Sequence, residues 1–153
     1  MYRPASQGAG LLIGGKNMQL GEDATLEEIK QVFNRDRFAT QAASCHIVEG
    51  GRGHAVCEMV LQDKHRNGMD NVMGGAIFTL ADFALAIASN VGQPPTVSVS
   101  HSMDFFRATK GSKLIATAQC DKEGRSLAFF TVEVRDDLGK SIARMTAVSS
   151  RVG

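Results

Sequence analysis

The hydrophobic and polar positions of this 153-residue chain change their period along its length. Between residues 76 and 90 apolar residues occur on nearly every side of a helical wheel, which predicts a long helix buried almost all round. After residue 95 the pattern changes to an alternation of period two, which predicts strands. One apolar helix is therefore followed by a series of strands.

Two further elements are predicted before the long helix. Thr25 and Glu28 form a capping-box pattern, and the residues that follow have the spacing of a short amphipathic helix ending near Asp36. Residues 42–48 and 54–61 flank a glycine-rich turn, which predicts a β-hairpin.

The strands after the long helix are predicted at residues 96–106, 113–120, 127–135 and 141–150. Short turns separate them, which indicates a four-stranded antiparallel meander. In the first strand, simple alternation places Ser98 and His101 on opposite faces. Because one sheet has to cover the helix on several sides, the predicted fold class is α+β, with an antiparallel sheet wrapped around a long central helix. The helix keeps an open flank, which favours a homo-oligomer.

Length and composition indicate one folded domain at residues 18–153. Residues 1–17 are rich in glycine and small residues, and we interpret them as a flexible N-terminal tail or a cloning remnant, with Met18 as an alternative start. The net charge of +1 gives no field that favours nucleic acid or a membrane surface as a partner. No apolar run is long enough to span a bilayer, and three dispersed cysteines are typical of free thiols in the cytoplasm.

The long apolar helix contains one carboxylate, Asp82. An ionised carboxylate is costly to bury unless something compensates its charge. Thr79 and Asp82 share a narrow stripe of small and polar residues that leads back to Gly74 and Gly75 at the helix start. On the helical pattern alone, a satisfied core carboxylate and a functional one are both open.

The start of this helix has the chemistry to polarise a carbonyl group. Its N–H groups are unpaired, the positive end of the helix dipole lies there, and Gly74 and Gly75 allow a close approach. Each good donor stabilises an oxyanion by roughly 3–4 kcal/mol. Asp82 lies roughly 10 Å further along the axis, which leaves room for a carbonyl and a water. Acyl transfer to water requires such a pair.

Other polar residues give weaker indications. Asn67 has a strong structural alternative as a loop or capping residue, and Asp70 or Asn71 is the predicted N-cap of the long helix. The four histidines have no ligand spacing, so no metal site is predicted. No cysteine has the context of a nucleophile.

Two stretches of the chain together resemble a known family. Asn67 is followed after five residues by Met73-Gly74-Gly75 and then by Leu80-Ala81-Asp82, and a later strand ends in Phe105-Phe106-Arg107-Ala108. This combination resembles the hotdog-fold acyl-CoA thioesterases of the phenylacetate-degradation (PaaI-like) type. The resemblance implies a hotdog fold, assembly into dimers or tetramers, and an acyl-CoA substrate at the dimer interface. It also implies hydrolysis to free CoA and a carboxylic acid without a metal or cofactor.

The resemblance also implies roles for individual residues. Asp82 corresponds to the catalytic carboxylate, acting as general base or nucleophile. Gly74, with Gly75 beside it, corresponds to the helix-terminal N–H that holds the thioester oxygen. Asn67 corresponds to an asparagine that orients thioester and water, and Ser98 occupies a position near the nucleophilic water. The carboxylate and the helix terminus of one site are expected to come from different protomers.

One departure from the family pattern bears on the function. Met73 stands where many members have histidine, so the loop has to be held in another way and slower catalysis is expected. Gly75, Met73, Thr79 and Ser98 are the predicted substrate-binding residues. The alternative function is a non-catalytic acyl-CoA-binding or sensing protein. A hydratase or dehydratase is less favoured, because no histidine is paired with an acid at the helix start.

Overall fold

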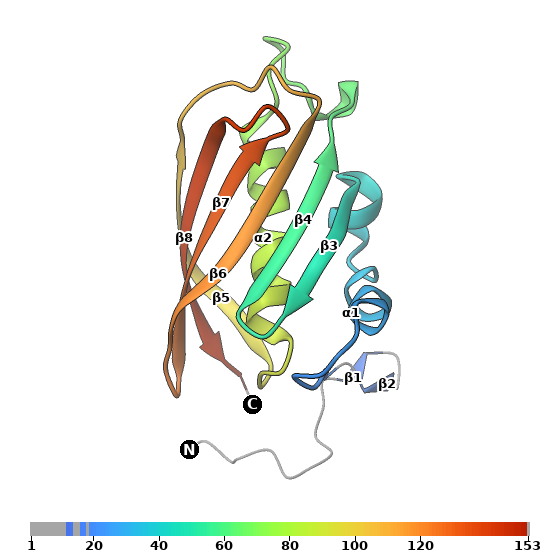
Figure 1. Cartoon of the computed structure of the whole chain (residues 1–153), viewed down its shortest axis with the longest axis vertical. Coiled ribbons are helices and arrows are strands. Elements are labelled where there is room, and N and C mark those ends of the chain that lie inside the picture. Colours follow the sequence, from blue (N-terminus) through green and yellow to red (C-terminus); the bar gives the residue numbers. More distant parts are fainter. Residues whose placement is uncertain (1–11, 14–15, 18, 153) are drawn as a thin grey trace.

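A six-stranded antiparallel sheet curves around one central helix, α2 (Gly74–Asn90), in the computed structural model (Figure 1). The structure describes residues 12–13, 16–17 and 19–152. The strand order is β3-β4-β6-β7-β8-β5. The strands are β3 (Cys45–Gly51), β4 (His54–Val60), β5 (Thr96–Phe105), β6 (Lys113–Glu123), β7 (Leu127–Asp136) and β8 (Ser141–Arg151). The predicted antiparallel sheet around a long helix is confirmed.

The segments before the sheet are short. Of the predicted tail, the structure describes β1 (Leu12–Ile13) and β2 (Lys16–Asn17), which pair antiparallel, and the rest of the tail lies outside the described residues. Helix α1 (Leu26–Phe33) follows, then a π-helical turn (Phe38–Ala42), and a 3₁₀ turn (Asp63–His65) lies between β4 and α2.

The predicted capping box at the start of α1 is confirmed. The Glu28 carboxylate accepts a hydrogen bond from the Thr25 N–H at 2.8 Å, and the Thr25 hydroxyl accepts one from the Glu28 N–H at 3.3 Å. Two donors that a helix start would leave unpaired are thereby satisfied within the chain.

The predicted meander is correct for β6, β7 and β8 and wrong for β5. β5 pairs with β8 at the far edge of the sheet, and β6 pairs instead with β4. The connection after Phe105 therefore crosses from one edge of the sheet to its middle (Figure 1). This arrangement joins the β3-β4 hairpin to the other strands and covers the edge of β4, which a meander would have left unpaired.

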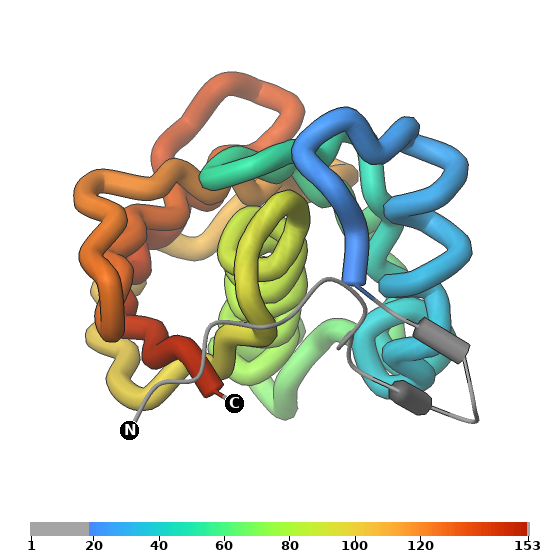
Figure 2. The backbone as a smooth tube through the Cα atoms, turned by 90° about the horizontal axis from the view of Figure 1, so that it is seen from below, coloured from blue at the N-terminus to red at the C-terminus, as the bar shows by residue number. Residues whose placement is uncertain are grey.

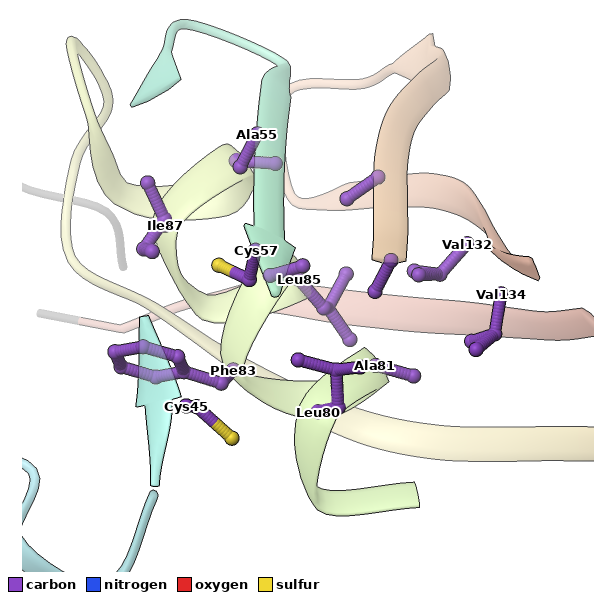
Figure 3. Packing of buried hydrophobic residues seen from close by; sticks show 14 of the residues in the cluster. Cys45, Ala55, Cys57, Leu80, Ala81, Phe83, Leu85, Ile87, Val132 and Val134 are labelled. Carbon is purple, nitrogen blue, oxygen red and sulfur yellow. The ribbon is translucent and has the colours of Figure 1, made fainter. Parts of the chain in front are cut away.

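The core lies between the concave face of the sheet and α2. Ala55, Cys57 and Met59 of β4 point inward and are fully buried, as the alternation predicts. Figure 3 shows Leu80 and Leu85 of α2 among the inward side chains of the strands. Within the described residues, no helix has both the length and the apolar character that crossing a membrane requires.

One glycine allows β3 to approach both helices. A Cβ atom on Gly50 would lie 2.9 Å from Cγ2 of Ile87 in α2 and 3.2 Å from Cδ1 of Ile29 in α1. A side chain at this position would push the hairpin away from α2. Gly50 therefore helps to close the sheet tightly over one side of the central helix.

A bulge in β5 changes which side chains face α2. The register against β8 shifts between Ser98 and Ser100, which leaves Val99 as an additional residue. Ser98 lies opposite the buried Ser149, and directly paired residues share a face of the sheet. Ser98 therefore faces α2, as His101 does beyond the bulge. The prediction that these two residues lie on opposite faces was wrong, because alternation cannot register an inserted residue.

Candidate active site

The stripe of small and polar residues predicted along α2 lies on a side of the helix that stays largely accessible. We call this side the open flank. Gly75 is exposed, and Thr79, Asp82 and Ala86 are partly exposed, whereas Ser89 at the far end is buried. In the end-on view of Figure 2, strands lie on one side of α2 and the α1 segment on the other. Gly75, Thr79, Asp82 and Ala86 therefore lie along a part of the helix surface that the rest of the chain leaves accessible.

Asp82 is half-buried in the single chain, and its carboxylate lies close to a histidine side chain. The Asp82 side chain is 46% exposed, and Oδ1 lies 3.2 Å from Nε2 of His101 on β5. Nε2 itself is buried and has no hydrogen-bond partner among the described residues, so the contact has the distance of a hydrogen bond without its alignment. The His101 ring also packs edge to face against Phe78, with centroids 5.1 Å apart and planes at 82°.

The environment of Asp82 favours its neutral form. Burial raises the pKa of the carboxyl above its usual range, the charge and contact of His101 oppose this rise, and the charge of Asp36 adds to it. Carboxylates with a raised pKa are frequent at catalytic sites, because such a group takes up a proton more readily.

Among the described residues, no side chain caps the start of α2. The N-cap residue is Met73, so the prediction of Asp70 or Asn71 in this role was wrong. Asp70 instead has a left-handed backbone with φ 61°, which turns the chain before the helix. Within the described part of the chain, the N–H groups of Gly74 and Gly75 donate to no protein acceptor. They are available to an oxygen atom of a ligand.

Asn67 shapes the loop that leads into α2. Its Oδ1 accepts hydrogen bonds from the N–H groups of Met69 at 3.0 Å and Asn71 at 3.2 Å. The backbone of Asn67 also donates to the Asn71 carbonyl at 2.8 Å. The side-chain oxygen is therefore engaged within the loop, which is the structural alternative that the sequence offered for this residue.

The buried His65 also holds this loop in place. Nδ1 accepts a hydrogen bond from the Gln62 N–H at 3.0 Å, so Nε2 carries the proton and donates to the Ala43 carbonyl at 2.7 Å. The His65 carbonyl in turn accepts from the Met73 N–H at 2.8 Å. Met73, which cannot hydrogen-bond through its side chain as imidazole would, is thus fixed through its backbone by a buried histidine eight residues earlier.

A pocket adjoins the helix start. The Phe105 ring lies over Gly74, with Cζ 3.3 Å from the position of a Cβ atom, so a side chain at Gly74 would meet the ring. The pocket has a volume of about 310 Å³, within the lower part of the range for small-ligand sites. Its lining comes from the helix start and the end of β5: Asn71, Val72, Gly74, Ile77 and residues 105–109.

The predicted site residues form two groups within one chain. Met73, Gly74 and Gly75 lie at the helix start, and Asp82 lies eight residues further on, about 12 Å along the axis at 1.5 Å per residue. Thr79 donates its hydroxyl to the Gly75 carbonyl at 2.8 Å, so it is satisfied within the helix. Ser98 faces α2 from β5.

His101 is the residue that the sequence patterns missed. It was considered for metal ligation, for which it has no suitable spacing, and not as a partner of Asp82. The alternating pattern of β5 did contain this information. It places His101 with Met103 on one face of the strand, and the sheet has to cover the helix with one of its faces. Combining that face with the stripe on α2 would have brought His101 and Asp82 together.

The buried cysteines do not suit nucleophilic chemistry. Burial, and to a lesser extent the charge of Asp36, raises the pKa of the Cys45 thiol to about 12. Burial likewise raises the pKa of Cys57. Because the thiolate is the reactive form, both groups are inert near neutral pH.

Solved structures with this architecture define the class of protein. The structure of the Escherichia coli PaaI protein from the phenylacetic acid degradation operon matches with a TM-score of 0.77 and 26% sequence identity. The match covers 83% of this chain and 93% of that chain. The predicted hotdog fold is thus confirmed.

Sequence comparison identifies the family. Residues 69–143 match the model of the thioesterase superfamily. Acyl-coenzyme A thioesterase PaaI of Escherichia coli K12 is 31% identical over 123 residues, which is 80% of this chain and 87% of the relative. Human acyl-coenzyme A thioesterase 13 is 29% identical over 122 residues, 77% of this chain and 87% of the relative. The chain belongs to the thioesterase superfamily, as a PaaI-like thioester hydrolase.

Proposed function

We propose that this protein hydrolyses acyl-CoA thioesters to free CoA and a carboxylic acid, with Asp82 as the reacting carboxylate. The observation that carries the proposal is the open flank of α2, which presents a half-buried carboxylate and unpaired N–H donors on one helix. The relatives named acyl-CoA thioesterases support CoA as the thiol part of the substrate.

The proposed chemistry uses two groups, the N–H donors at the start of α2 and the Asp82 carboxylate. The N–H of Gly74, with that of Gly75 beside it, holds the thioester oxygen and stabilises the oxyanion that develops on it. Asp82 as general base takes a proton from water while the water oxygen bonds to the carbonyl carbon. The C–S bond then breaks, and the CoA thiolate leaves and takes up a proton. With Asp82 as nucleophile instead, its carboxylate bonds to the carbonyl carbon, the C–S bond breaks, and CoA leaves as the thiolate. The mixed anhydride that remains is then hydrolysed by water to the carboxylic acid and free Asp82.

The remaining site residues surround these groups. Asn67, by shaping the loop, places the helix start, and Met73 presents an exposed apolar side chain beside it. Thr79 lies between the helix start and Asp82 on α2, whereas Ser98 precedes His101 on β5, on the side of Asp82 away from the helix start. We assign Met73, Gly75, Thr79 and Ser98 to substrate binding.

A complete site requires two protomers in this proposal. Gly74 and Asp82 of one chain lie about 12 Å apart along the helix axis, and the family resemblance implies that the two groups of one site come from different protomers. Among the described residues β5 is an edge strand that pairs with β8 on one side only, and Val97 and Val99 on it are 50% and 59% exposed. Exposed apolar edge strands favour pairing with another chain. We propose a homodimer joined along β5, alone or paired into a tetramer, with the thioester at its interface.

The substitution Asp82→Asn tests the catalytic assignment. Removing a general base costs about a hundredfold or more in kcat, and the isosteric amide keeps the fold intact. Thiol release from short, long and aryl acyl-CoAs measures the activity, and circular dichroism checks the fold. Asp23→Asn makes the same chemical change at an exposed position before α1 and should leave turnover unchanged. Near wild-type turnover by Asp82→Asn contradicts the proposal.

Subunit complementation tests the shared site. Asp82→Asn and Gly74→Val homodimers should both be inactive, since each lacks one half of every site. Random exchange of equal amounts yields about half heterodimers, each with one intact site, so roughly a quarter of the activity should return. No recovery after verified exchange places both groups in one protomer. Acyl-CoA binding by calorimetry without thiol release across the whole panel would support the non-catalytic alternative, and hydration of an enoyl-CoA without thiol release would support a hydratase.

A further inference from the structure

We propose that His101 is a positioning residue for Asp82, which orients the carboxylate and sets the lowest pH at which hydrolysis proceeds. This inference rests on the proposed function, because it requires Asp82 to be the reacting carboxylate. His101 lies on β5 and Asp82 on α2, so the pair joins the edge strand of the sheet to the central helix.

The geometry directs the imidazole at the carboxylate. Beyond the bulge at Val99, His101 faces α2. The His101 side chain is 20% exposed, its Nε2 is buried, and 3.2 Å separates that atom from Asp82 Oδ1. A buried nitrogen without a hydrogen bond is costly, so a small rotation of either side chain that aligns the contact is favoured.

Phe78 fixes the plane of the imidazole ring. Its ring meets His101 edge to face at 5.1 Å, and it lies one helical turn before Asp82 on the same helix. The helix thus supplies both the group that His101 contacts and the group that packs against its ring. Because its own ring is held by Phe78, His101 can hold the Asp82 carboxylate in a fixed orientation.

The charges around Asp82 show what His101 contributes. His101 faces it from β5, and Asp36 acts on it from the segment after α1. Burial and Asp36 both favour the protonated carboxyl, whereas His101 favours the ionised one. A protonated carboxyl cannot take a proton from water, so His101 extends catalysis to lower pH.

The chain contains a matched control for this pair. His54 on β4 lies 3.2 Å from Glu49 on β3, the same distance between the same kinds of atoms. Both of these side chains are exposed on the hairpin, where solvent screens their interaction. Removing His54 therefore makes the same chemical change without altering the surroundings of Asp82.

The pH dependence of kcat/KM tests the inference in wild type, His101→Leu, His101→Gln and His54→Leu. Removing an opposite charge at this distance raises the pKa of a carboxyl by about one unit. The acid limb of His101→Leu should therefore move up by about one pH unit, with about tenfold lower activity on the wild-type limb and recovery at higher pH. His101→Gln keeps a donor without a charge and should shift less. His54→Leu should match wild type.

A titration of the Asp82 carboxyl carbon by ¹³C NMR, assigned by its loss in Asp82→Asn, gives a readout independent of turnover. The pH midpoint of this titration should rise in His101→Leu and rise less in His101→Gln. The glutamine variant keeps a polar side chain, so it serves as the test if the leucine variant does not fold. An unchanged midpoint and acid limb overturn the role of His101, while an inactive Asp82→Asn still upholds the thioesterase proposal. Full turnover by Asp82→Asn overturns both.

Discussion

The two sides of α2 differ in what surrounds them. On the sheet side, Leu80, Ala84 and Ile87 are fully buried against the concave face formed mainly by β4 and β6. On the open flank, Gly75, Thr79 and Asp82 remain partly or fully exposed in the single chain. One helix therefore has one side fixed by packing and another side available to a substrate or a second protomer.

The residues that stabilise the fold and the residues proposed to react therefore lie on different sides of one seventeen-residue helix. The sheet side provides the burial of apolar surface that makes the helix form. The open flank contains the groups that a fully packed helix would exclude, namely a carboxylate and helix-start donors without partners. Substitutions on the two sides should therefore affect different measurements.

The largest expected effect is on the sheet side. Leu80→Ala leaves a cavity at a fully buried position and should lower the free energy of unfolding by about 3 kcal/mol. Urea denaturation measures this, and kcat per folded molecule should change by no more than about threefold, since Leu80 contacts no reacting group. The paired control is Thr79→Ala on the open flank, whose effect on stability should stay below about 1 kcal/mol. Equal losses at the two positions would contradict the division.

The next effect is at the helix start. In Gly74→Ala the new methyl group lies 3.3 Å from Phe105 Cζ, so the ring has to move by a few tenths of an ångström. Displacing the ring beside the proposed oxyanion donor should lower kcat/KM by about tenfold, or about 1.4 kcal/mol. Gly75→Ala meets Met73 Cε at an ordinary 3.6 Å and should cost less. Steady-state kinetics decide the order, and a larger loss for Gly75→Ala would contradict it.

The smallest effect, and the most direct test of the comparison, is a gain in stability on the open flank. Asp82→Leu replaces a half-buried carboxylate by an apolar side chain, and the apolar area that leucine buries should raise the free energy of unfolding by about 1 kcal/mol while turnover is lost. Thermal unfolding at neutral pH shows whether the substitution raises or lowers the stability. A loss of stability would mean that Asp82 helps to hold the fold, as a satisfied core carboxylate does.

Local patterns were sufficient for the elements of this fold. The capping box at Thr25, the apolar helix from Gly74 and the strand alternation depend on neighbours a few residues apart, and the structure contains each of them. Pairing depends on distant residues, so the placement of β5 beside β8 could not be predicted from turn lengths.

The candidate site was predictable to the same extent. Asp82, Gly74 and Gly75 share one helix, so their common flank follows from helical spacing. The contact of Asp82 with His101 spans nineteen positions, so finding it required combining one face of β5 with the stripe on α2. The bulge, which alternation does not show, decided the face of Ser98. Likewise, the support of Met73 by His65 requires a buried histidine whose partners lie on other segments.

The bulge at Val99 also makes the length of β5 tolerant of change during evolution. Deleting the Val99 codon would bring Ser98 and Ser100 into succession opposite Ser149 and Val148, which are already consecutive in β8. The strand would then alternate regularly, and His101 would keep its place opposite Ala147 and its present face of the sheet. Descendants of this sequence can therefore lose position 99 without turning His101 away from α2.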